Sequence, residues 1–376
     1  MDKITSGIYI HFPFCKVKCG YCDFYSIINR EDSIPVFIDS LIHEIELYFN
    51  TCDTSKFSFD SLFMGGGTPS LIQPQYIERI FNTLSKYVDI SSLIEITMEA
   101  NPGEAPRSSL KAYREIGVNR ISFGFQSLDD RLLKFLDRVH TSEQCNIAFK
   151  DARAAGFDNI NTDMIFNVPG QTLDILNDNL NAVIKLGPEH ISSYSLTVEK
   201  GTMLYNNVLK GKVLMPDEKL DYDMYRKTSD IISENGYKQY ETSNFSRESK
   251  ECIHNLHYWN LDPYISFGPS AHGYDGKRRW WNHRSLDKYI SDLKNNILPV
   301  NNSETLSKKN QYNEIIMNGL RTSRGVNLNN LNTICKSENL NEIVQKWPQL
   351  IIENDYLKLK DDDYMLLDEI TSELFI

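Results

Sequence analysis

Near its start the chain reads His11-Phe-Pro-Phe-Cys-Lys-Val-Lys-Cys-Gly-Tyr-Cys-Asp-Phe24, which places Cys15, Cys19 and Cys22 in a C-x3-C-x2-C spacing. Three thiolates can hold a [4Fe–4S] cluster and leave one iron without a protein ligand, whereas electron-transfer clusters of this type take four cysteines. The alternatives are a zinc site or three unrelated thiols, but zinc sites usually pair two knuckles or add histidines at short spacing. Because no second knuckle follows, the spacing favours a cluster whose open iron can bind a small molecule.

Length and charge limit the function classes. The chain has 376 residues, enough for one domain of about 250 residues and a smaller one. Its formal net charge of −11 argues against nucleic-acid binding and against a role at a membrane surface. No apolar stretch approaches the roughly 20 residues of a transmembrane segment, and the N-terminus lacks a signal-peptide core, so we expect a cytoplasmic protein. The remaining cysteines are scattered and predict reduced thiols: Cys52, Cys145, Cys252 and Cys335.

Short β-rich runs alternate with segments of helical period in the first part of the chain. Six such units in series predict an α/β fold with a parallel sheet and right-handed crossovers. Six are too few to close an eight-stranded barrel, so we expect an open, partial (β/α)6 barrel. The expected strands are Gly7–His11, Phe59–Met64, Ile94–Glu99, Arg120–Phe125, Asn161–Phe166 and His190–Val198. The expected helices include Val36–Phe49, Gln75–Tyr87, Arg107–Ile116, Ser142–Ala155 and one between Thr172 and Gly187.

The pattern changes after the sixth unit. We assign residues 1–237 to the partial barrel and 238–300, which are rich in Tyr, Trp, His, Asn and Gly with little periodicity, to a linker and ligand-contact segment. Residues 301–376 form a smaller, mostly helical C-terminal domain that resembles a winged helix, with a hairpin that runs from Tyr356, turns at 361–363 and resumes at 364–367. Its acidic excess favours a structural or protein-contact role over DNA binding.

Polar and glycine-rich motifs fall at the carboxyl ends of the expected strands, where α/β barrels carry their sites. Gly65-Gly-Gly-Thr-Pro69 can bring backbone close to a ligand, although alone it is a turn. Glu99 and Gln126 end two strands and Asp163 lies inside a third. Asp163 and Arg138 could form a structural ion pair, or they could contact a ribose hydroxyl and a carboxylate.

A second group of candidate residues is His254-Asn-Leu-His-Tyr-Trp259. An aromatic-rich loop with two histidines suits a flat, metal-bearing ligand, because imidazole is a common axial ligand of haem iron. The alternative is a packed loop that closes the barrel, and physical reasoning alone favours it. His272 is a weaker candidate, and His11 beside the cysteines could move protons but is more often structural in such a place.

These motifs resemble those of the radical S-adenosylmethionine (SAM) superfamily. Over essentially the whole chain the sequence is similar to the haem-chaperone branch of the family that includes oxygen-independent coproporphyrinogen III dehydrogenase. The resemblance implies that Cys15, Cys19 and Cys22 hold the cluster, whose open iron binds the amino and carboxylate groups of SAM. It implies SAM contacts by Tyr9, Tyr21, Gly66, Gly67, Thr68, Glu99, Gln126, Arg138, Asp163 and Thr197.

Two features separate the branches. The dehydrogenase carries a fourth cysteine two residues after the third, where this chain has Phe24, and it has a longer N-terminal arm. The chaperone branch carries H-N-x-x-Y-W, which 254–259 match, so the resemblance makes His254 the best haem-ligand candidate. One departure is Ser270, where glycine is more usual.

The resemblance implies a haem chaperone that delivers haem to acceptor haemoproteins, with no residue assigned to catalysis and without coproporphyrinogen dehydrogenase activity. A homodimer is a further expectation, since the cluster could serve dimerisation or haem release more than substrate turnover. The alternatives are the dehydrogenase itself and a radical SAM enzyme with an unrelated substrate.

Overall fold

The computed structural model describes residues 3–335, 340–360 and 364–376. Within them a twelve-stranded sheet has the order β12-β11-β10-β9-β1-β2-β3-β4-β5-β6-β8-β7, and its six consecutive central strands run parallel. The α/β class with a partial (β/α)6 barrel is therefore confirmed. The central strands are β1 (Ile4–Phe12), β2 (Phe57–Gly66), β3 (Glu95–Ala100), β4 (Arg120–Gln126), β5 (Ile160–Phe166) and β6 (His190–Ser195).

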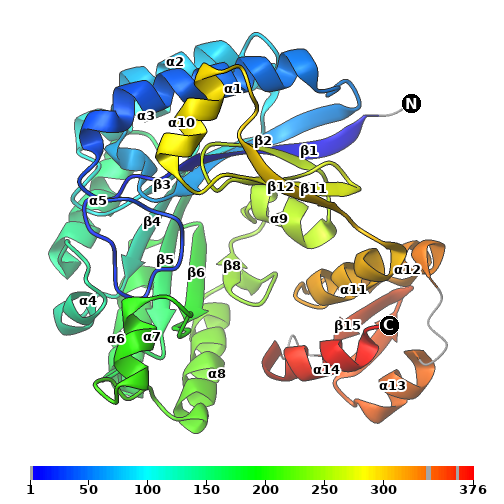
Figure 1. The fold of residues 1–376 in the computed structure, drawn as a ribbon. Helices are drawn as coiled ribbons and strands as arrows, with labels where there is room; N and C mark the ends of the chain where they lie inside the picture. Colours follow the sequence, from blue (N-terminus) through cyan, green and yellow to red (C-terminus); the bar gives the residue numbers. More distant parts are fainter. Residues whose placement is uncertain (1–2, 336–339, 361–363) are drawn as a thin grey trace.

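Helices cover the outer face of this sheet (Figure 1). Thr141, Thr172 and Asp217 cap α5, α6 and α8 with their side chains, and α6 ends at Gly187, whose φ of 72° suits glycine. The crossover and flanking helices are α1 (Ile34–Thr51), α2 (Pro74–Leu84), α3 (Arg107–Ile116), α4 (Asp130–Phe135), α5 (Ser142–Ala154), α6 (Leu173–Leu186), α7 (Met203–Leu209) and α8 (Glu218–Glu234).

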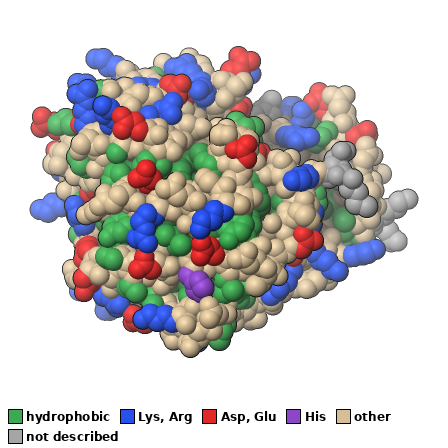
Figure 2. All heavy atoms as spheres, turned by 90° about the horizontal axis from the view of Figure 1, so that it is seen from above, with side chains coloured by type: hydrophobic (Ala, Val, Ile, Leu, Met, Phe, Trp, Pro, Cys, Tyr) green, Lys and Arg blue, Asp and Glu red, His purple; other side chains and the backbone are tan. Residues whose placement is uncertain are grey.

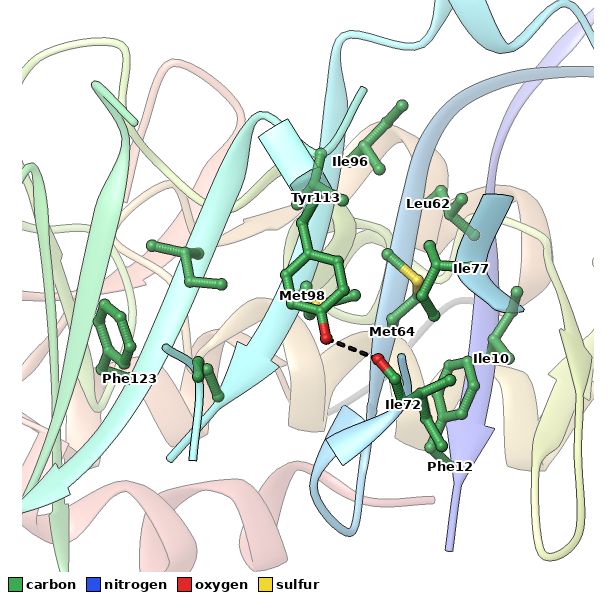
Figure 3. Packing of buried hydrophobic residues seen from close by; sticks show 14 of the residues in the cluster. Ile10, Phe12, Leu62, Met64, Ile72, Ile77, Ile96, Met98, Tyr113 and Phe123 are labelled. Carbon is green, nitrogen blue, oxygen red and sulfur yellow. Dashed lines mark hydrogen bonds between the residues drawn. The ribbon is translucent and has the colours of Figure 1, made fainter. Parts of the chain in front are cut away.

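Side chains alternate across the strands, so each strand has an apolar outer face and a polar inner face. Leu62 and Met64 of β2 and Met98 of β3 pack against the helices, where the Tyr113 hydroxyl of α3 donates to the Ile72 carbonyl at 2.6 Å (Figure 3). The intervening side chains face the interior of the barrel. The polar groups of this inner face hydrogen-bond to one another, as Asn161 does to Asp163 and Ser122, or face the cavities of the candidate site.

The segment from 238 to 300 contains more regular structure than the sequence predicts. Its strands extend both edges of the sheet, because β9 pairs in parallel with β1 and β8 pairs antiparallel with β6. Strands of two to five residues are too short to show a period, which is why the sequence did not reveal them. The role of this segment as a linker and ligand contact stays a prediction. The elements are β7 (Lys238–Gln239), β8 (Asn244–Ser246), α9 (Ile253–Asn260), β9 (Tyr264–Phe267), β10 (His272–Tyr274), β11 (Arg278–Asn282) and α10 (Leu286–Lys294).

The C-terminal part has a hydrophobic core of its own around Tyr312, Leu357 and Ile370. Among the residues described, four helices and a small sheet of order β13-β15-β14 surround it, which agrees with the winged-helix expectation. The chain divisions at 237 and 300 stay predictions. The elements are β12 (Val300–Thr305), α11 (Lys308–Gly319), β13 (Val326–Asn327), α12 (Leu328–Ile334), α13 (Leu340–Lys346), β14 (Leu350–Glu353), β15 (Tyr356–Leu359) and α14 (Leu367–Leu374).

The terminal hairpin lies earlier than expected. Strand β15 pairs back to β14 through a two-residue turn, Asn354-Asp355, with φ of 51° and 64°. Asn and Asp are favoured in such turns, so the signal was present in the sequence. The expected turn at 361–363 lies outside the described residues, and Tyr364–Leu366 form a 3-10 helix rather than a returning strand.

The surface seen from above Figure 1 carries basic and acidic side chains interspersed with apolar ones (Figure 2). This mixed pattern on one face is typical of a surface exposed to water. Among the described residues, no helix combines the length and the apolar character that crossing a membrane requires.

Candidate functional site

The three cysteines lie on the loop that follows β1. They line a small cavity of about 70 Å³. Hydrogen-bond donors approach two of the sulfur atoms, because the Thr68 hydroxyl lies 3.5 Å from Cys15 Sγ and the Arg138 guanidinium lies 3.8 Å from Cys19 Sγ. Donors of this kind stabilise sulfur atoms that carry negative charge, so the surroundings fit metal-bound thiolates.

The three thiols are not gathered as the ligands of a single metal ion. In the described part of the chain no three His, Cys, Asp or Glu side chains gather closely enough to hold one metal ion. A four-iron cluster takes each thiolate on a different iron, so its cysteines do not converge on one point. Burial raises the pKa of the Cys22 thiol to about 11, and a metal would have to displace that proton.

The glycine loop after β2 is fastened to the cysteine loop. The backbone N–H of Gly67 donates to the Phe12 carbonyl at 2.7 Å, and that of Thr68 donates to the Phe14 carbonyl at 2.8 Å. A Cβ atom on Gly66 would lie 2.3 Å from the His11 ring, and Gly66 has a φ of 109° that side chains rarely adopt. The glycines are therefore required by close backbone packing at the point where a ligand would meet the cysteines.

Two buried carboxyl groups face the barrel interior. Glu99 accepts the Gly66 N–H at 3.0 Å, and burial together with the nearby Asp163 raises the pKa of Glu99 to about 7. Burial also raises the pKa of Asp163, although it accepts hydrogen bonds from Asn161 at 2.7 Å and from Ser122 at 3.3 Å. Two such carboxyls can each accept from an amino or hydroxyl group of a ligand.

Gln126 and Arg138 occupy unusual positions. Gln126 has a φ of 67° at an irregularity in the pairing of β4 with β5, and a left-handed residue at a strand end is often found at a binding site. Arg138 donates to the Gly124 carbonyl at 2.8 Å and to the Asn101 side chain, while its Nε has no partner among the described residues. Arg138 and Asp163, both described residues, do not form the direct ion pair that was one alternative from the sequence.

A cavity of about 790 Å³, here called the main cavity, opens beside the cysteine loop. It brings together most of the residues expected to contact SAM. Those that line it are Tyr21, Gly66, Gly67, Thr68, Glu99, Gln126, Arg138, Asp163 and Thr197. Their assignment to SAM stays a prediction. Phe24, at the position of the dehydrogenase's fourth cysteine, also lines the main cavity and is 65% exposed.

A smaller cavity of about 280 Å³, here called the inner chamber, shares Glu99 and Asp163 with the main cavity. Tyr9 and His254 lie on its wall. The Tyr9 hydroxyl lies 3.1 Å from His11 Nδ1, and His11 Nε2 lies 2.8 Å from the Tyr25 carbonyl. Because a carbonyl only accepts, His11 donates through Nε2. Burial lowers the pKa of His11 to about 4, so the ring is neutral and Nδ1 accepts from the Tyr9 hydroxyl.

His254 lies on helix α9, not on a loop, and is fully buried. Its Nε2 lies 2.9 Å from the Tyr258 hydroxyl and its Nδ1 lies 3.2 Å from the Ser61 hydroxyl. Burial lowers the pKa of His254 to about 3, so the ring is neutral, as a metal ligand must be. Both ring nitrogens are occupied, and iron coordination would require one of these contacts to break.

Several inward-facing residues were missed by the sequence analysis. Arg120 is fully buried on the wall of the inner chamber, and its Nε has no partner among the described residues. The alternating pattern Arg-Ile-Ser-Phe-Gly-Phe-Gln of β4 could have revealed it, because Arg120 shares the face of Gln126. Arg321 and Asp368, from the C-terminal part, also line the main cavity. No pattern in the sequence points to their position there.

Comparisons with known proteins agree with this geometry. A family model described as the radical SAM superfamily matches residues 9–183. A relative from Bacillus subtilis named heme chaperone HemW is 35% identical over 85% of this chain and 84% of that protein. A relative of the same name from Lactococcus lactis is also 35% identical, over 87% and 84%. The chain belongs to the HemW family.

Other similarities agree with membership of the HemW family. A zebrafish protein named radical S-adenosyl methionine domain-containing protein 1, mitochondrial, is 30% identical over 100% of this chain and 89% of that protein. The solved structure of coproporphyrinogen III oxidase (HemN) from Escherichia coli has a TM-score of 0.83 and 18% identity, covering 100% of this chain and 90% of that one. At this identity it shows the fold alone. The resemblance to radical SAM proteins is confirmed.

Proposed function

We propose that this chain is a haem chaperone built on a radical SAM scaffold, which binds haem as its cargo and delivers it to acceptor haemoproteins. The observation that carries the proposal is membership of the HemW family at 35% identity over 84% to 87% of both chains. The main cavity of about 790 Å³ supports it, because pockets for cofactor-sized ligands commonly have volumes of this order.

The scaffold would hold a [4Fe–4S] cluster through Cys15, Cys19 and Cys22. When bound and reduced, such a cluster supplies one electron to the sulfonium of SAM, which breaks a C–S bond. The protein's own part is to orient SAM. Gly66 and Gly67 leave room for close backbone approach, while Glu99 and Asp163 offer acceptors to amino and hydroxyl groups.

His254 is the proposed haem ligand, and it lines the inner chamber, which borders the main cavity. The chamber is lined by His254 and shares Glu99 and Asp163 with the main cavity. Iron would have to replace Tyr258 as the partner of His254 Nε2, since these two atoms lie 2.9 Å apart. Haem binding through His254 therefore includes a movement of this ring or of helix α9.

An anaerobic haem titration of the cluster-reconstituted protein, read by the Soret band, tests this assignment. Wild type should bind haem at one saturable site, and His254→Ala should weaken binding sharply. Tyr258→Phe removes the competing hydroxyl and should leave His254 free to bind more tightly. His272→Ala tests the weaker candidate in the same assay and should leave haem binding unchanged, because His272 stacks on Trp281 with 5.8 Å between ring centroids and lines neither cavity. A haem affinity that is unchanged in both His254→Ala and Tyr258→Phe would refute the assignment.

The second candidate function is oxidative decarboxylation of coproporphyrinogen III. The radical SAM scaffold is compatible with it, but Phe24 stands at the position of the dehydrogenase's fourth cysteine. An assay with SAM, a low-potential reductant and coproporphyrinogen III separates the two functions. We expect no protoporphyrinogen product, and its formation at a catalytic rate would favour the enzyme over the chaperone.

A further inference from the structure

The C-terminal part of the chain forms one wall of the main cavity. Residues of the 3-10 helix and of α14 line it together with Arg321, which follows α11. In Figure 1 the cysteine loop (dark blue) and α14 (red) lie on either side of β6 and β8. A ligand in the main cavity would thus lie between the barrel, which carries the cysteines, and the C-terminal part, which has a hydrophobic core of its own.

Backbone hydrogen bonds fix the position of Arg321. Its carbonyl accepts the Thr242 N–H at 3.0 Å, and its own N–H donates to the Asn318 carbonyl at 3.1 Å. An isolated bridge between Glu241 and Thr322 fixes the same turn against the barrel side. The side chain is therefore presented to the cavity from a rigid position, which is how proteins usually hold a group that recognises a ligand.

Two cationic side chains line the main cavity among the described residues, Arg138 and Arg321. Arg138 is already engaged with the Gly124 carbonyl, the Asn101 side chain and the Cys19 sulfur. Among the described residues Arg321 makes one ion pair, with Asp368 at 3.1 Å, and the Asp368 side chain is 87% exposed while that of Arg321 is 26% exposed. The buried Glu241 also lies close enough for Arg321 to lower its pKa, although burial outweighs this and raises it. Ion pairs open to water are weak, so a ligand carboxylate can replace Asp368.

We infer that Arg321 binds a carboxylate side chain of a tetrapyrrole at the end of the main cavity that the C-terminal part forms, beside the residues expected to contact SAM. The inference rests on the proposed function. A guanidinium can hold a carboxylate through two parallel hydrogen bonds, and that bond gains strength as the ligand excludes water. The neighbouring wall suits the rest of such a ligand, because the exposed aromatic rings of Phe24 and Tyr194 line the same cavity.

The test compares haem with haem dimethyl ester, in which both carboxylates are esterified, by anaerobic Soret titration of the reconstituted protein. Wild type should bind haem about tenfold or more tightly than the ester. Arg321→Gln should lose about tenfold in haem affinity and leave ester affinity unchanged, while Arg321→Lys should retain part of the preference. Asp368→Asn removes the competing carboxylate and should raise haem affinity.

Arg324→Gln is the matched control. Arg324 lies on the same turn but donates to the Tyr356 hydroxyl at 3.0 Å and faces a different cavity, so its removal should change neither affinity. Thermal unfolding of each variant separates a folding defect from a binding defect. Equal losses for haem and ester in Arg321→Gln, or no loss, would overturn the inference. Absence of haem binding by wild type would instead refute the proposed function itself.

Discussion

Glu95 of β3 caps the helix that carries His254. Its carboxylate oxygens accept the backbone N–H of Ile253 at 2.9 Å and that of His254 at 3.2 Å. The first N–H groups of a helix have no partner within it, so a side-chain acceptor there stabilises the helix. A negatively charged group at this end also interacts favourably with the helix dipole. The orientation of the helix that carries the proposed haem ligand is thus set by the first side chain of strand β3.

Replacing Glu95 by Gln should loosen α9. The amide keeps one acceptor oxygen but loses the charge, and we expect the free energy of unfolding to fall by about 1–2 kcal/mol. Urea unfolding measures the loss, and haem titration should show weaker binding. Glu115→Gln, at an exposed position on α3, is the control and should leave both quantities unchanged within error. Equal stability of the Glu95 and Glu115 variants would contradict the capping role.

His257, on the same helix, should make stability depend on pH. Burial alone would lower its pKa, but hydrogen bonds to Asp262 at 3.0 Å and Asp60 at 2.7 Å outweigh this and raise the pKa to about 9. A folded-state pKa above the unfolded value of about 6.5 gives stability that is fully present below pH 6.5 and is lost as pH rises through 9.

Urea unfolding of wild type and His257→Asn at pH 6 and at pH 9.5 isolates this effect. The difference in unfolding free energy between the two proteins should shrink by about 2 kcal/mol from the lower to the higher pH, after allowance for partial solvent screening. A difference that is constant or grows with pH would show that the imidazole is not protonated in the folded protein.

Ser270 has a φ of 64°, a left-handed conformation that disfavours any residue with a Cβ. Glycine adopts this conformation without that penalty, which agrees with the glycine that the family resemblance implies at this position. Ser270→Gly should raise the free energy of unfolding by about 1 kcal/mol. Ser270→Ala removes the hydroxyl but keeps the Cβ, so thermal unfolding should show no comparable gain for this control. Destabilisation by the glycine would mean that the hydroxyl matters more than the backbone strain.

Gly66→Ala should damage the site directly. The new Cβ would meet the His11 ring at 2.3 Å in addition to the unfavourable φ of 109°. We expect lower iron content after reconstitution, weaker SAM binding and a loss of more than about 2 kcal/mol in stability. Gly170→Ala is a matched control, because Gly170 has a φ of 84° but nothing within 4 Å of its Cβ position. It should lose only about 1 kcal/mol and retain iron and SAM binding.

Local signals made much of the barrel predictable. Helix α6 begins after Thr172 and ends at Gly187 as predicted, because a cap and a glycine stop act within a few residues. The cysteine motif and the polar residues at the strand ends are also local patterns, and most of the site residues they predict line the main cavity. Helix α9 was missed because its cap, Glu95, lies 158 residues before Ile253 in the chain. Arg321 was missed because only the packing of the C-terminal part brings it to the cavity.

Transfer of haem tests the central claim most directly. The reconstituted protein is loaded with one equivalent of haem without oxygen, mixed with a haem-free acceptor protein, and followed by the shift of the Soret band from the donor's to the acceptor's. The account predicts saturable loading through His254 and complete transfer, faster than from free haem in buffer. Failure to load haem, or loading without any transfer, would contradict it.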